Sequence, residues 1–108
     1  DFPAWLAPEQ ARILTISERA ESAAAALLAE CEARDLRVEL DDRNESLGKK
    51  IREARLMRVP YLFVIGDREV DEGTAAVRSR QGEQFGSLSH EDAVAWLAEK
   101  SLSPSLDL

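Results

Sequence analysis

The chain has 108 residues, of which 44% are hydrophobic and 32% are charged. This length fits one domain with a real core and leaves no room for a second, and the composition is that of a globular rather than a disordered protein. No apolar run is long enough to cross a bilayer, and no signal-peptide pattern opens the sequence. The single cysteine excludes an internal disulfide and fits a reducing cytosol. Because the sequence starts without Met, we expect a fragment of a longer protein.

The net charge of −7 disfavours extended contact with nucleic acid, because phosphates are bound by cations. Residues 43–58 depart from this balance: they hold six basic and two acidic residues, a local charge of +4, which leaves −11 for the rest of the chain. A basic island on an acidic body suits a small, defined RNA contact and not sequence-blind binding along a duplex.

The first part of the chain predicts a strand, a helix and a second strand. Residues 12–16 are apolar and β-branched, as in a strand. Ser17 is a predicted N-cap for a helix that runs to about Ala33. Residues 37–40 alternate as in a second strand. The buried face predicted for the helix consists of Ala20, Ala24, Leu27, Leu28 and Cys31.

The basic island predicts a helix over about residues 46–57. Leu47, Ile51 and Ala54 form its apolar stripe, and Lys49, Arg52 and Glu53 fall on the opposite face, since each residue advances about 100° around the axis. Residues 61–65 are continuously apolar, which predicts a central strand that is covered on both faces.

The last part of the chain predicts a hairpin and a helix. Residues 74–80 and 83–88 read as strands joined by a turn at Gln81 and Gly82, and Ser89, with Asp92 three residues on, caps a final helix. The order β-α-β-α-β-β-β-α predicts a single α/β domain of three layers, with a mixed five-stranded sheet and three helices. We expect this domain to span residues 1–100, with a frayed tail at 101–108.

No catalytic centre is indicated. His90 is expected to be a solvated surface residue and Cys31 a buried hydrophobe. No close set of His, Cys and carboxylate residues predicts a metal site. No Gly-rich turn leads into a helix with a lysine at the spacing of a phosphate loop.

Several motifs in order resemble one family. They are the opening Phe2-Pro3-Ala4-Trp5-Leu6-Ala7-Pro8, residues 41–55 followed by Val59-Pro60-Tyr61, Gly66-Asp67-Arg68-Glu69-Val70, residues 73–80, and Gly86-Ser87-Leu88. Together they closely resemble the C-terminal anticodon-binding domain of threonyl-tRNA synthetase, over nearly the whole chain. The resemblance implies the same five-stranded mixed sheet with three helices.

The resemblance also implies which residues read the anticodon. An Arg fork suits O6 and N7 of guanine, a carboxylate accepts from its N1–H and 2-amino donors, and an Asn amide suits uracil. Such reading needs splayed, single-stranded bases, and we expect Arg78 and Glu69 to act on one guanine. The implied anticodon-binding residues are Asn44, Arg52, Arg58, Glu69 and Arg78, and the possible phosphate contacts are Arg43, Lys49, Lys50 and Arg55.

Each of these residues also has a purely structural interpretation. Asn44 could be a turn or cap residue, Arg52 and Lys49 a solvated helix face, and Arg58 a complement to the carbonyl end of its helix. Glu69 and Arg78 could form a surface ion pair of little energetic value.

The implied parent is a cytoplasmic, homodimeric ligase that joins threonine to tRNA. This domain would bind the guanine and uracil of the threonine anticodon, without cofactor and without catalysis, beside the catalytic domain of the same chain. ATP, magnesium and zinc would belong to that catalytic domain. The alternatives are the matching domain of a prolyl, glycyl or histidyl enzyme, a polymerase accessory or regulatory protein that borrowed the fold, and a domain whose basic helix meets an acidic protein.

Overall fold

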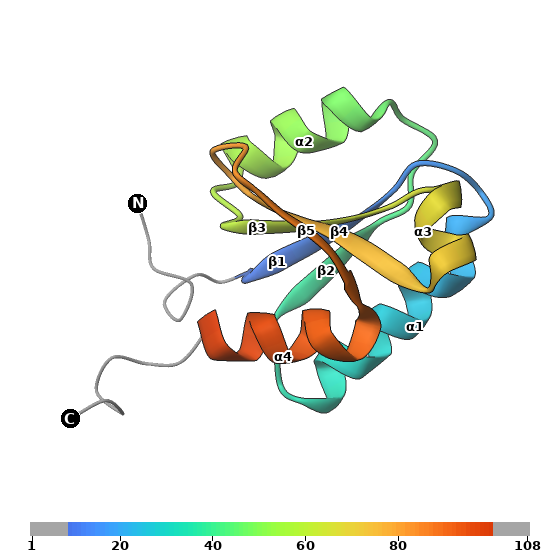
Figure 1. The fold of residues 1–108 in the computed structure, drawn as a ribbon. Helices are drawn as coiled ribbons and strands as arrows, with labels where there is room; N and C mark the ends of the chain where they lie inside the picture. Colours follow the sequence, from blue (N-terminus) through green and yellow to red (C-terminus); the bar gives the residue numbers. More distant parts are fainter. Residues whose placement is uncertain (1–8, 101–108) are drawn as a thin grey trace.

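A computed structural model describes residues 9–100 of the chain. The apolar opening at residues 2–8 and the tail predicted at residues 101–108 lie outside the described residues. Five strands form one mixed sheet in the order β2-β1-β3-β4-β5 (Figure 1). The strands are β1 (Ala11–Thr15), β2 (Val38–Asp41), β3 (Tyr61–Ile65), β4 (Thr74–Ser79) and β5 (Gln84–Ser89). β1, β2 and β3 run parallel, whereas β4 and β5 form an antiparallel hairpin, as the element order predicts.

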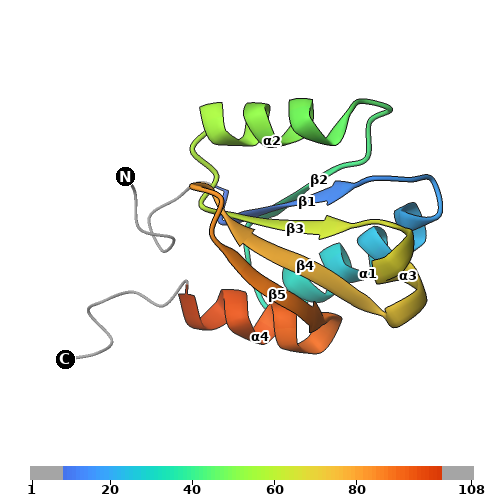
Figure 2. The ribbon, with the colours of Figure 1, turned by 45° about the horizontal axis from the view of Figure 1, so that its top comes forward.

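The helices cover the two faces of the sheet unequally. Helices α1 (Ala20–Ala33), α3 (Asp67–Glu72) and α4 (His90–Lys100) lie on one face, and α2 (Leu47–Leu56) lies alone on the other (Figure 2). The larger core lies beneath α1 and α4, around Phe63 and Ile65. The smaller core lies beneath α2, around Leu14, Leu62 and Val64. β3 therefore contributes to both cores, which explains its uninterrupted apolar sequence.

Helix α1 buries the face that its sequence predicts. Ala20, Ala24, Leu27 and Cys31 are all fully buried, and their small side chains let the helix approach the sheet closely. Burial is the main cause that raises the pKa of the Cys31 thiol to about 11, with the neighbouring Glu30 and Glu32 adding to it. Cys31 is a small core hydrophobe, as predicted.

Two predictions are wrong on the face of the sheet that α1, α3 and α4 cover, which is called the first face below. Ser17 is not the N-cap of α1: the helix begins three residues later at Ala20, and Ser17 Oγ donates instead to Asp67 Oδ1 at 2.6 Å. His90 is not solvated, because only 19% of its side chain is exposed, with Nδ1 3.8 Å from Glu30 Oε2 on α1. Both side chains make contacts with residues distant in sequence, which no local pattern reveals.

The sheet carries a fourth helix, where three were predicted. α3 is only six residues long and has no buried residue, so it leaves no apolar periodicity in the sequence. Local groups stabilise it: Glu69 Oε1 accepts from the backbone N–H of Gly66 at 2.7 Å, and Gly73 ends the helix with a left-handed φ of 71°. Glycine adopts that conformation at little cost.

Helix α2 begins as predicted, with Ser46 Oγ accepting from the N–H of Lys49 at 3.2 Å. Its buried stripe also contains a charged residue that sequence reasoning missed. Lys50 is 1% exposed, and its Nζ donates to the carbonyl oxygen of Thr15 at 2.7 Å, at the end of β1. Lys50 lies three residues after Leu47 and four before Ala54, so the spacing of the stripe already includes it.

The β4–β5 hairpin contains a bulge. The register pairs Val77 with Gly86 and Arg78 with Gln84, so Phe85 has no partner across the hairpin. Phe85 packs on the first face with Tyr61 and Trp96, with its ring 6.5 Å and 5.1 Å from theirs. The other face of the hairpin is only partly covered, since Thr74, Ala76 and Arg78 are half-buried where alternate residues of β4 are buried.

The Lys50 bond predicts an unequal effect of two neighbouring substitutions. Lys50→Met keeps the apolar stem but leaves the Thr15 carbonyl without its donor, which should lower the free energy of unfolding by about 1–3 kcal/mol. Lys49→Met, on the exposed side of the same helix, should change it little. Urea denaturation measures both. A Lys50→Met chain as stable as the wild type would mean that desolvation of the ammonium cancels the bond.

Candidate nucleic-acid interface

Four of the five residues expected to read bases fall at the two ends of the sheet, and the fifth lies on α2. Asn44 and Glu69 follow β2 and β3, so they lie at the carboxyl end of the parallel strands. Arg58 precedes β3, and Arg78 is paired with Leu62 near the start of β3, so both lie at the amino end. Arg52 is exposed on α2. A five-residue strand spans about 17 Å, so the two groups lie about one strand length apart.

The structure does not bring Glu69 and Arg78 together. The Glu69 carboxylate is held at the N-terminus of α3 by the N–H of Gly66. The Arg78 guanidinium points toward the β4–β5 turn, where its Nη2 lies 3.7 Å from the Cβ position of Gly82. In this arrangement the carboxylate is absent from the pocket that Arg78 lines. The expectation that both act on one guanine stays a prediction.

Arg78 lies at the rim of an open pocket on the face that α2 leaves uncovered. The pocket has a volume of about 210 Å³ and a floor of apolar side chains from α2, β3 and β4. Arg78 Nε is shielded from solvent and has no hydrogen-bond partner in the described chain. An unpaired guanidinium beside an apolar floor suits a stacked base whose edge offers acceptors. The lining residues are Leu47, Val64, Ala76, Val77, Arg78, Gln84, Gly86 and Ser87.

Asn44 lines a second, smaller cavity at the carboxyl end of the strands, of about 180 Å³. Its walls are polar and include four carboxylates, with Lys50 as a buried cation at its base. Asn44 is exposed at the opening of this cavity. The amide is therefore free to donate and accept at the surface, which is what an unpaired pyrimidine requires.

Three of the four residues predicted to contact phosphate are already occupied. Lys50 is buried and its ammonium donates to the carbonyl oxygen of Thr15, so the ammonium is not at the surface. Lys49 is paired with Glu45, and this bond raises the pKa of Lys49 and lowers that of Glu45. Arg43 bridges Asp41 and Glu53. The sequence shows the charges of these residues but not their partners.

Within residues 43–58, the cations that remain available are the arginines toward the end of α2 and just after it. Arg52, Arg55 and Arg58 are exposed, and none forms an ion pair with another described residue. Arg58 adopts a left-handed φ of 60°, which turns the chain sharply from α2 into β3. The surface that can meet phosphates is therefore narrower than the sequence predicts, but it adjoins the open sheet face.

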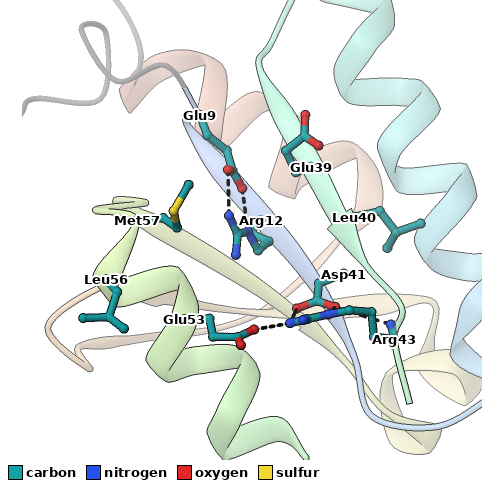
Figure 3. A pocket seen from close by; sticks show the side chains of 9 residues that line it. All are labelled: Glu9, Arg12, Glu39, Leu40, Asp41, Arg43, Glu53, Leu56 and Met57. Carbon is teal, nitrogen blue, oxygen red and sulfur yellow. Dashed lines mark hydrogen bonds and ion pairs between the residues drawn. The ribbon is translucent and has the colours of Figure 1, made fainter. Parts of the chain in front are cut away.

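A groove of about 770 Å³ lies elsewhere, between β2 and the end of α2 (Figure 3). Its arginines are neutralised: Arg12 donates to both oxygens of Glu9 at 2.7 and 2.9 Å, and Arg43 to both oxygens of Asp41 at 2.8 Å. Glu39 and Glu53 add further negative charge. Four carboxylates against two arginines make this groove unsuitable for phosphates.

The ion pair between Asp41 and Arg43 shifts the pKa of both partners. The bond to Arg43 is the main cause that holds the pKa of Asp41 below its usual range. The same bond, together with Glu53, raises the pKa of Arg43. The network ties the end of β2 to α2.

The described part of the chain contains neither a metal-binding cluster nor a membrane-spanning helix. Within residues 9–100, no group of three His, Cys, Asp or Glu residues is placed to hold a metal ion. Across the same residues, no helix combines the length and apolarity needed to span a membrane. The described residues place hydrogen-bonding side chains and cations around an open sheet face, which is typical of a binding domain.

Residues 10–100 match a family model described as an anticodon binding domain, and the chain belongs to this family. Within the family, the chain is similar in sequence to threonine–tRNA ligases. It is 43% identical over 105 residues to threonine–tRNA ligase from Caldanaerobacter subterraneus subsp. tengcongensis, and 49% identical over 105 residues to the same enzyme from Magnetococcus marinus. These alignments cover 97% of this chain but only 16% of each relative, so the chain spans about one sixth of their length.

A solved structure shows the same fold. The RNA binding domain of threonyl-tRNA synthetase from Cryptosporidium parvum Iowa II superposes with a TM-score of 0.88 at 29% sequence identity. The match covers 97% of this chain and 26% of that one. The predicted resemblance to the threonyl enzyme is thereby confirmed, as is the mixed five-stranded sheet.

The Asp41–Arg43 bond predicts a pH-dependent stability. Because the pKa of Asp41 is lower in the folded chain, the bond contributes stability above the unfolded pKa of about 3.9, and this contribution is lost as the pH falls through the folded value. Asp41→Asn should therefore destabilise the chain most above about pH 5, and progressively less toward pH 2. Urea denaturation across this range measures the difference. In an Arg43→Met background the pH dependence of that difference should shrink; an unchanged dependence would exclude Arg43 as its cause.

Proposed function

We propose that this chain is the anticodon-binding domain of a threonine–tRNA ligase and that it binds the anticodon loop of threonine tRNA. The observation that carries the proposal is the unpaired Arg78 at the rim of an open, apolar-floored pocket, in a chain whose family is that of anticodon binding domains. A single-stranded loop can supply the unstacked base that such a pocket accepts.

The two ends of the sheet support reading of two bases. Arg78, at the amino end, suits the O6 and N7 acceptors of a guanine. Asn44, at the carboxyl end, suits the alternating acceptors and donor of a uracil. We assign Glu69 and Arg52 to contacts around these bases, and Arg55 and Arg58 to the backbone that joins them. The separation of the ends, about the length of one strand, favours different nucleotides at each.

The parent protein would carry out the reaction outside this chain. A threonine–tRNA ligase of this kind joins threonine to tRNA with ATP, and we place ATP, magnesium and zinc in its catalytic domain. We further propose a cytoplasmic, homodimeric parent. The relatives named above are threonine enzymes, which favours this parent over a prolyl, glycyl or histidyl one. This domain supplies recognition alone.

Removal of the Arg78 guanidinium should weaken the preference for guanine. Arg78→Ala should cost about 1–3 kcal/mol of binding free energy toward a threonine anticodon stem-loop, because a bidentate contact to O6 and N7 is lost. The cost should largely vanish when that guanine is replaced by adenine. Titration of each loop by fluorescence anisotropy measures both. Equal losses for the matched and substituted loops would show that Arg78 does not read the base.

The narrow set of available cations predicts a shallow salt dependence. Two or three phosphate contacts correspond to a slope of log affinity against log salt of about −1.5 to −2 for single-stranded RNA. Arg55→Ala should make the slope less steep by about 0.7, whereas Lys49→Ala should change it less, since Lys49 is paired with Glu45. The measurement is a set of titrations between 50 and 300 mM salt, roughly the range over which such slopes are resolved. A slope near zero would favour a protein partner.

A further inference from the structure

The bulge in the β4–β5 hairpin decides which side chain stands opposite Arg78. Ser87 pairs with Ala76, and both line the open pocket. Without a bulge, Phe85 would pair with Arg78 and point into the same pocket, because side chains on a strand alternate between faces. The extra residue shifts the register by one, so Gln84 takes this place and Phe85 turns to the aromatic cluster.

Several contacts hold this arrangement. Phe85 packs against Trp96 and Tyr61, with ring centroids 5.1 Å and 6.5 Å away. Gly86 adopts a left-handed φ of 88°, which allows the bulge without backbone strain. Below the bulge, Ser79 Oγ accepts from the N–H of Glu83 at 3.0 Å, which secures the turn. The position of Gln84 is thus set by the fold and not by its own side chain.

Gln84 is free to interact with a ligand. It is exposed at the pocket rim, directly across the hairpin from Arg78, and its amide makes no hydrogen bond with another described residue. The rim therefore offers, side by side, a guanidinium that only donates and an amide that also accepts. The apolar floor beneath them is formed by Leu47, Val64 and Ala76.

This order of groups matches one base edge. Around guanine, the acceptors N7 and O6 are followed directly by the N1–H and 2-amino donors. With N7 and O6 on Arg78, the adjoining donors face the neighbouring side chain on the rim. Adenine places an amino group where guanine has O6, so it would set a donor against the guanidinium.

We propose that Gln84 is a second guanine-reading residue, whose amide oxygen accepts from the N1–H and 2-amino donors of the base that Arg78 holds. This inference rests on the proposed function, because it concerns the same pocket. It assigns to Gln84 the acceptor role that the sequence alone suggests for Glu69, which is held at Gly66 and does not line the pocket.

Modified bases allow the contacts of Gln84 and Arg78 to be tested separately. Anticodon stem-loops carry guanine, inosine, which lacks the 2-amino group, or 7-deazaguanine, which lacks N7, at the second anticodon position. The wild-type chain should bind both modified loops about three- to tenfold more weakly than the guanine loop. Gln84→Ala should remove the inosine penalty and keep the 7-deazaguanine penalty, and Arg78→Ala should do the reverse.

Two further variants control this experiment. Gln81→Ala makes the same substitution in the turn of the same hairpin but outside the pocket, and should keep both penalties. Gln84→Glu keeps an acceptor oxygen, so the inosine penalty should persist even where overall affinity falls. Far-ultraviolet circular dichroism confirms that each variant is folded.

The outcomes distinguish this inference from the proposed function. Should the wild-type chain fail to prefer guanine over adenine, the proposed function itself fails. Should it prefer guanine through Arg78 while Gln84→Ala keeps the full inosine penalty, or while the wild type shows none, the role of Gln84 alone is overturned. Exchanged penalties in the two alanine variants would establish both.

Discussion

The arrangement of this domain depends on one constraint: its central strand β3 must be covered on both faces, whereas its antiparallel hairpin need be covered on only one. β3 belongs to both cores and requires a helix on each side. The single helix α2 provides the second cover for β1 and β3 but leaves the outer face of the hairpin open (Figure 2). The candidate binding surface is this uncovered region, so the same packing that stabilises the fold creates the interface.

Charge is used in two different ways on this small domain. Arg43 joins β2 to α2, Lys50 joins α2 to the end of β1, and Lys49 is paired with Glu45 just before α2. Arg52, Arg55 and Arg58 are left for solvent or a ligand. An acidic body with a few free arginines limits non-specific attraction to phosphates, so we expect specificity to come from contacts to base edges, such as the one proposed for Arg78.

The hairpin shows how a local irregularity produces a binding feature. The bulge leaves Phe85 without a partner in the β4–β5 pairing. In return, the ring of Phe85 packs into the core and the amide of Gln84 lies at the pocket rim. The packing of Tyr61, Phe85 and Trp96 on the first face therefore fixes the hairpin register that places Gln84 on the opposite face. Substitutions in this aromatic cluster would act on binding through geometry, without touching the ligand.

The sequence by itself determined the element order, the central strand and most of the buried faces of α1 and α2, because apolar periodicity and capping residues are local signals. Its ordered motifs carried the resemblance to the family. It missed α3, which has no apolar face, and it misplaced Ser17 and His90, whose partners are distant in sequence. Only the tertiary structure decided which of the basic residues remain available, that Glu69 and Arg78 lie apart, and that Gln84 stands beside Arg78. The reason is physical: partners and register are set by the packing of strands far apart in the chain, and composition and spacing do not encode that packing.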